Sequence, residues 1–82
     1  ELSAERRKDL VKIISEISEK FKISIRSIRR KFLDEIKNLE KDKLISIDES
    51  KQFHDEVQKI TDKSISEIEK HTEAKQSEIL KV

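Results

Sequence analysis

Apolar residues recur along the first half of this chain at the spacing of one face of an α-helix. From Leu10 to Leu39, successive apolar positions are separated by 4, 3, 4, 4, 3, 4, 4 and 3 residues. The mean step matches 3.6 residues per turn rather than a strict heptad, so the pattern predicts one long, nearly straight amphipathic helix. The positions are Leu10, Ile14, Ile17, Phe21, Ile25, Ile28, Phe32, Ile36 and Leu39.

A second helix is predicted after a short break. The sequence has neither Gly nor Pro, which makes β-hairpins improbable. Ser46 and Glu49 have the spacing of a capping box, which marks a helix start, and Ser3 is a plausible N-cap for the first helix. We therefore expect an all-α chain, a helical hairpin of two long antiparallel helices, with helices over about residues 3–43 and 47–81 and a turn over about 42–46.

The composition leaves such a hairpin short of a core. Charged residues make up 45% of the 82 residues and hydrophobic residues only 33%. A hairpin buries one seam where a three-helix bundle buries three, so we expect that a third surface is needed. Because the sequence starts at Glu1 and contains no Met, the missing surface could be preceding chain. It could also be a second copy, which predicts a homo-oligomer for the chain alone, for example a four-helix bundle.

Several classes of function find no support in the sequence. There is no Cys for disulfides or thiolate metal sites, and no apolar run longer than two residues for a membrane span. His54 and His71 are 17 positions apart without a paired-histidine spacing, so we expect surface residues rather than metal ligands. No serine has a recognisable base and oxyanion partner. We expect no catalytic residues, no metal and no cofactor.

Basic residues are concentrated in one stretch of the first helix. Residues 20–33 contain six basic residues and no acidic one, and the net charge is +4 over residues 1–43 but −3 over 44–82. At helical spacing, a basic stripe begins at the edge of the apolar face, and it predicts a flank that binds an anion. The alternative is a solvated charged face. The stripe consists of Lys22, Arg26, Arg29 and Lys37.

Four blocks of the sequence resemble the C-terminal part of the bacterial ribosome recycling factor family, in that family's order and spacing. The resemblance continues without an evident gap to the end of the chain. Joint chance occurrence of four blocks is very unlikely, whereas any one of them would be weak evidence. The blocks are residues 5–10 (ERRKDL), 25–30 (IRSIRR), 39–43 (LEKDK) with 45–46 (IS), and 57–63 (VQKITDK).

The resemblance implies an architecture and a function. The family folds as an elongated three-helix bundle with a smaller β-rich domain inserted between the first and second helices. This sequence would supply the second and third helices and would lack the first helix and the inserted domain. Proteins of the family bind the large ribosomal subunit after termination and, with elongation factor G, separate the subunits, catalysing no covalent chemistry themselves. That implies the bacterial cytoplasm or the interior of an organelle with bacterial-type ribosomes.

The resemblance also suggests RNA-binding residues. Arg26 and Arg29 match family arginines that contact RNA of the large subunit, and Arg30 and Arg7 match further family arginines. Because the two aromatic residues of this stretch lie on the apolar seam, we expect RNA to be held by its backbone and shape. The sequence departs from the family at residues 31–33 (KFL), where an acidic residue followed by small or polar ones is usual. Leu33 is expected to be exposed between Arg26 and Arg29.

Two other functions remain as alternatives. The chain could be a self-associating helical interaction module, whose stability would depend on concentration and not on Arg26 or Arg29. It could also be an amphipathic binder of membrane surfaces. That reading ranks last, because such helices need a more hydrophobic face and a more uniformly basic polar face than this sequence offers.

Overall fold

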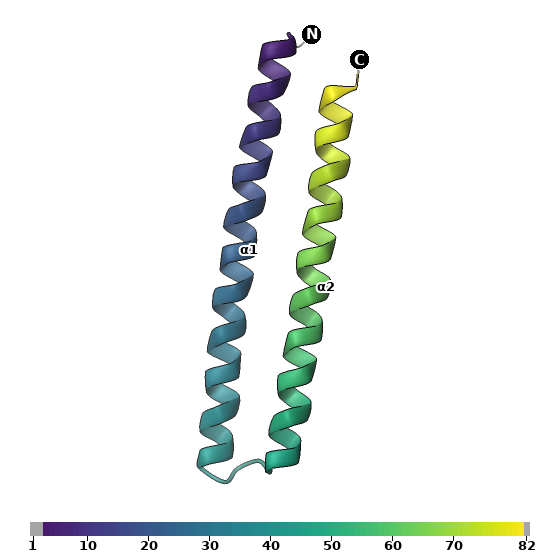
Figure 1. The fold of residues 1–82 in the computed structure, drawn as a ribbon. Coiled ribbons are helices and arrows are strands. Elements are labelled where there is room, and N and C mark those ends of the chain that lie inside the picture. Colours follow the sequence, from purple (N-terminus) through teal and green to yellow (C-terminus); the bar gives the residue numbers. More distant parts are fainter. Residues whose placement is uncertain (1–2, 82) are drawn as a thin grey trace.

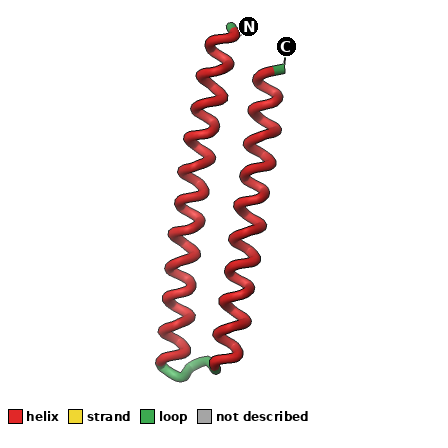
Figure 2. Tube along the Cα trace, viewed as in Figure 1, coloured by secondary structure: helices red, strands yellow, loops and turns green. Residues whose placement is uncertain are grey.

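The protein is a hairpin of two long antiparallel helices, confirming the predicted fold class. A computed structural model describes residues 3–81; residues 1, 2 and 82, which belong to the expected 1–82 unit, lie outside the described residues. Helix α1 spans Ala4–Lys41 and helix α2 spans Ile47–Leu80. The helices lie side by side along most of their length, with the start of α1 and the end of α2 at the same end of the hairpin (Figure 1). Figure 2 shows a short loop as the only link between them within the described residues.

The hairpin is narrow and elongated. Its Cα atoms extend over 61 × 15 × 11 Å, and their radius of gyration is 18.6 Å. A compact domain of this length would have a radius of gyration of about 12 Å. Neither helix contains a stretch that is long and apolar enough to cross a membrane, over the residues described.

Both predicted helix starts are confirmed in atomic detail. The Ser3 side chain accepts a hydrogen bond from the Arg6 backbone N–H at 3.1 Å, so it caps α1. At the start of α2, the Ser46 side chain accepts from the Glu49 N–H, and the Glu49 carboxylate accepts from the Ser46 N–H, both at 3.0 Å. These bonds satisfy backbone donors that have no partner inside a helix, which fixes where each helix begins.

The end of α1 is a Schellman motif made without glycine. The Lys43 N–H donates to the Glu40 carbonyl at 3.0 Å, and the Leu44 N–H donates to the Leu39 carbonyl at 2.9 Å. This pattern requires a left-handed residue after the cap, and Lys43 takes that conformation with φ 60°. Because the chain contains no Gly, a residue with a Cβ bears the steric cost of the turn.

The contact between the helices does not follow the apolar stripe predicted from the sequence. The buried residues are Ser18 and Thr61, each 6% exposed, and no hydrophobic residue is buried within residues 3–81. Phe21 and Phe32, expected in the seam, are 59% and 57% exposed. The expectation that the apolar stripe packs between the two helices is therefore wrong for these residues. Only some apolar positions at the edge of the contact are half-buried, among them Ile25.

The offset has a physical reason. The two residues buried at the contact, Ser18 and Thr61, have small side chains, which allow helices to pack closely, and the longer apolar side chains of the stripe lie to one side. The Thr61 hydroxyl donates to the Val57 carbonyl at 2.7 Å, so its burial leaves no unpaired hydroxyl. On α1, Ser18 lies about 60° around the helix from Phe21, counting 100° per residue. The contact line and the apolar stripe are thus neighbouring faces.

The Schellman turn gives a stability prediction. Replacing Lys43 with Gly should raise the free energy of unfolding by up to about 1 kcal/mol, because Gly adopts positive φ without a Cβ clash. Urea unfolding followed by circular dichroism, at one fixed protein concentration, measures the change. Lys41→Gly, inside the last turn of α1, should instead destabilise by about 1 kcal/mol. Equal effects of the two substitutions would contradict the role of Lys43.

Candidate nucleic-acid interface

Polar side chains connect the helices along one side of the contact. Gln76 donates from its amide to the Ser15 hydroxyl at 2.8 Å and to the Val11 carbonyl at 3.2 Å. The hydroxyl oxygens of Thr72 and Ser18 lie 3.1 Å apart in a hydrogen bond. We call this set the polar ladder; its cross-helix pairs are Gln76 with Ser15, Thr72 with Ser18, Glu69 with Lys22, and Gln58 with Arg29.

The pair formed by Ser18 and Thr72 divides two unlike faces of the hairpin. Both residues line a polar hollow together with Lys22 and Glu69. Both also line an apolar hollow together with Ile17 and other residues of the stripe. The charged side chains of Lys22 and Glu69 therefore lie on one side of the contact line, and most of the apolar stripe lies on the other.

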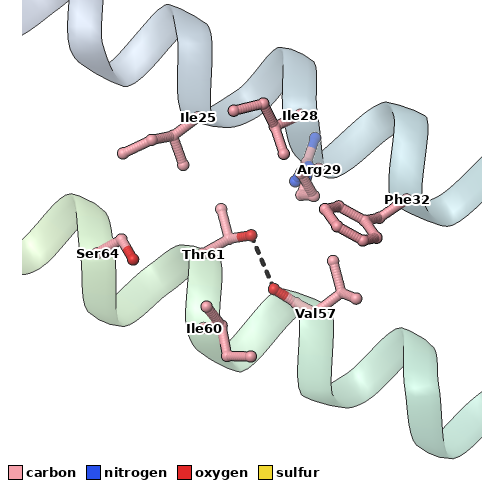
Figure 3. Close-up of a pocket in the computed structure, with 8 residues that line it drawn as sticks. All are labelled: Ile25, Ile28, Arg29, Phe32, Val57, Ile60, Thr61 and Ser64. Carbon is pink, nitrogen blue, oxygen red and sulfur yellow. Dashed lines mark hydrogen bonds between the residues drawn. The ribbon is translucent and has the colours of Figure 1, made fainter.

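The apolar side forms a groove between the helices, which we call the apolar groove. Its larger hollow has a volume of about 330 Å³, and side chains from both helices project around it (Figure 3). Arg29 is the one charged residue that lines this hollow. A second hollow of about 280 Å³ continues the groove toward the chain ends. The first is lined by Ile25, Ile28, Arg29, Phe32, Val57, Ile60, Thr61 and Ser64, and the second by Ile14, Ile17, Ser18, Phe21, Ile68, His71, Thr72 and Lys75.

The basic residues on the other side differ in how they are paired. Lys22 lies 3.4 Å from Glu19 and 3.7 Å from Glu69, and its side chain is only 15% exposed, so its charge is largely balanced. Arg26 and Arg30 are exposed and form no ion pair with any residue between 3 and 81. At helical spacing, Lys37 continues their face. We call Arg26, Arg30 and Lys37 the basic flank.

Arg29 stands at the inner edge of the basic flank and is half-buried. Its Nη1 donates to the Gln58 Oε1 atom across the helix contact at 3.3 Å. Its Nε is buried and has no hydrogen-bond partner among the described residues. The guanidinium is therefore held between the helices, while Arg26 and Arg30 extend into solvent.

The fourth predicted arginine is not part of this group. Arg7 is half-buried in the second turn of α1, 22 positions before Arg29. That separation is about 33 Å along a helix. The structure thus brings Arg26, Arg29 and Arg30 together within about one turn and leaves Arg7 at the end near the chain termini.

Two further sequence expectations concern this region. Leu33, expected to be exposed, is half-buried, because the contact line is rotated toward its side of α1. His54 and His71 are exposed. Across the described chain, no cluster of three or more His, Cys, Asp or Glu side chains has a geometry that could hold a metal ion.

Comparison with known proteins identifies the family. The family model described as ribosome recycling factor matches residues 1–80. The chain belongs to the ribosome recycling factor family. It is 52% identical over 82 residues to the ribosome-recycling factor of Lachnoclostridium phytofermentans, covering 100% of this chain and 45% of that protein. It is 48% identical over 81 residues to that of Symbiobacterium thermophilum, covering 99% of this chain and 44% of that protein.

The chain spans less than half the length of the ribosome recycling factors it matches. A third relative, from Clostridium novyi, is 51% identical over all 82 residues, which are 44% of its length. The matched relatives named here are bacterial proteins. The resemblance expected from the four sequence blocks is therefore confirmed as family membership.

The polar ladder and the partner of Arg29 were not predicted from the sequence. Gln58 and Gln76 lie on the α2 face that meets α1, yet a search for apolar periodicity passes over amides and hydroxyls. The available signal was the poor apolar pattern of α2, in which Thr61 and Thr72 occupy positions that a packed seam would fill with larger apolar residues.

The small residues of the contact line give a second stability prediction. Replacing buried Ser18 with Leu should lower the free energy of unfolding by about 2 kcal/mol, because the larger side chain pushes the backbones apart and removes the bond to Thr72. Ser66→Leu, on an exposed face of α2, should change it by less than about 0.5 kcal/mol. Urea unfolding measures both. A Ser18→Leu protein as stable as the parent would contradict the close contact.

Proposed function

We propose that this chain is the ribosome-contacting helical part of a ribosome recycling factor, and that Arg26 and Arg29 bind phosphates of large-subunit RNA. The complete protein then acts with elongation factor G to separate the subunits after termination, in the bacterial cytoplasm. It acts by binding and not by covalent catalysis. One observation carries the proposal. Arg26 and Arg29 form no ion pair within residues 3–81, and they lie at the positions that the resemblance assigns to RNA contact in a chain of this family.

The electrostatics of the hairpin support a phosphate-binding surface. The chain has 18 acidic residues, yet none lies within ion-pair distance of the basic flank among the residues described. A rigid helix that presents arginines on successive turns can bind several phosphates without first breaking internal ion pairs. Arg30 adds charge to this surface. Arg7, about 33 Å away, would need a separate contact.

The apolar groove supports the expected place of the chain in a larger bundle. We propose that a third amphipathic helix, contributed by the part of a recycling factor that this chain does not span, packs into the groove. The relatives extend beyond the match by more than half of their length, which is ample for such a helix. In that arrangement the third helix packs into the groove and RNA binds the basic flank across the contact line, while Arg29, which lines the groove, borders both surfaces.

The arginine proposal predicts a change in ribosome binding. A full-length protein, made by joining this chain to the N-terminal part of the Lachnoclostridium phytofermentans relative, should bind purified large subunits in co-sedimentation. Arg26→Ala and Arg29→Ala should each weaken binding about tenfold. Each should also reduce the magnitude of the negative slope of log affinity against log salt by about one.

A matched substitution controls for the loss of one positive charge. Lys63→Ala removes an exposed charge from α2 and should leave the affinity within about twofold of the parent. Circular dichroism should show unchanged helicity for all variants. Binding that is equally strong without both arginines would refute the proposed RNA contact.

A second candidate function is a self-associating helical module. It is favoured by the absence of any buried hydrophobic residue between positions 3 and 81, which leaves the apolar groove uncovered. For the chain alone, a second copy could cover the groove and form a four-helix bundle. The two candidates differ in the joined full-length protein, which should be monomeric if a third helix fills the groove and oligomeric if the module reading is right.

Two isoleucines test which face self-associates. Ile28 lines the groove and is 51% exposed, whereas Ile23 is 59% exposed and lies about 140° around α1. For the isolated chain, Ile28→Ser should weaken self-association at least about tenfold in sedimentation equilibrium, and Ile23→Ser should not. A strictly monomeric chain with a cooperative melt, or equal effects of the two substitutions, would contradict association through the groove.

A further inference from the structure

Arg29 is the start of a three-residue chain of hydrogen bonds that crosses the hairpin. Its Nη1 donates to the Gln58 Oε1 atom at 3.3 Å. The Gln58 Nε2 atom donates in turn to the Asp62 Oδ1 atom at 2.9 Å. Gln58 and Asp62 lie one turn apart on α2, so the residue that contacts Arg29 is itself held by a second residue of the same helix.

The chemistry of the three groups fixes the direction of the Gln58 amide. A guanidinium has only donors, and a carboxylate has only acceptors. The amide oxygen must therefore face Arg29, and the amide NH₂ must face Asp62. With both ends of its amide engaged, Gln58 presents its oxygen to Arg29 in a single orientation.

A comparison with Lys22 shows how the uncharged partner of Arg29 affects its charge. Lys22 and Arg29 are both half-buried basic residues of α1 that reach across to α2 in the polar ladder. Lys22 meets the carboxylate of Glu69, which balances its charge, whereas Arg29 meets an uncharged amide. Arg29 is thus held in place while its charge remains available to an outside anion.

The free edge of the guanidinium is also defined. Nε is buried and Nη1 is engaged with Gln58, while Nη2 makes no hydrogen bond within residues 3–81. We propose that Gln58, oriented by Asp62, is the positioning residue that holds the Arg29 guanidinium with its Nη2 edge toward a phosphate of large-subunit RNA. This inference rests on the proposed function. Its physical benefit is that Arg29 is ordered before binding, so that less side-chain freedom is lost on contact.

The test is a double-mutant cycle in the joined full-length protein, with binding to purified large subunits measured over a salt series. Gln58→Ala should weaken binding about fivefold when Arg29 is present and should have no effect when Arg29 is already Ala. Gln58→Glu should weaken it by more, because a carboxylate would compete with phosphate for the guanidinium. The Glu variant should also reduce the magnitude of the negative slope of log affinity against log salt, which a loss of packing alone would not do.

Gln76→Ala is the matched control, because Gln76 is the other glutamine whose amide crosses the helix contact, and it meets no arginine. It should lower the urea midpoint to a similar extent as Gln58→Ala and leave ribosome affinity unchanged. Two outcomes would overturn this inference alone. In the first, Gln58→Ala weakens binding equally whether residue 29 is Arg or Ala. In the second, Gln58→Ala does not weaken binding although Arg29→Ala does. If the ribosome affinity of the joined protein does not depend on Arg29, both this inference and the proposed function are overturned.

Discussion

The burial of small side chains at two separate points of the helix contact, Ser18 on α1 and Thr61 on α2, is the constraint on which the rest of this hairpin depends. Small side chains allow the helices to meet there, and the Thr61 hydroxyl is satisfied by its own helix. The larger apolar residues are consequently displaced to one side, and the amides, hydroxyls and charges of the polar ladder occupy the other. A seam of large apolar residues would have buried the stripe between the helices and left no apolar face for a third element.

This division of faces links the fold to the proposed work of the protein. The apolar groove is the surface through which the hairpin joins a larger bundle or a second copy of itself. The basic flank lies across the contact line, so an anion can bind without competing with that partner. Arg29 lies between the two, lining the groove and contacting Gln58, and the contact between the helices thereby positions a residue proposed to bind RNA.

Much of the architecture could be predicted from the sequence because it depends on local rules. The helical period, the cap at Ser3 and the capping box at Ser46 are read from neighbouring residues, and the structure confirms them.

The face of each helix that meets the other could not be predicted in this way. Apolar periodicity identifies the stripe at Phe21 and Phe32, but the contact is decided by how closely the backbones can pack, which favoured Ser18 and Thr61 instead. Helical spacing placed Arg26 and Arg29 on one stripe, and the resemblance added Arg30. Gln58, in contrast, reaches Arg29 from a position 29 residues away, which required the three-dimensional arrangement.

The proposed function places RNA of the large subunit against the basic flank and Arg29, and not against the exposed groove side of α1. The chain contains no Cys, so a single cysteine can carry a tethered iron chelate that cleaves nearby RNA. Lys37→Cys places the probe on the flank, and Glu35→Cys places it two residues away but about 160° around the helix; both positions are exposed. In the joined full-length protein, with other cysteines removed, we expect strong cleavage of large-subunit RNA from position 37 and little from position 35. Equal cleavage from both positions, or cleavage from position 35 alone, would contradict it.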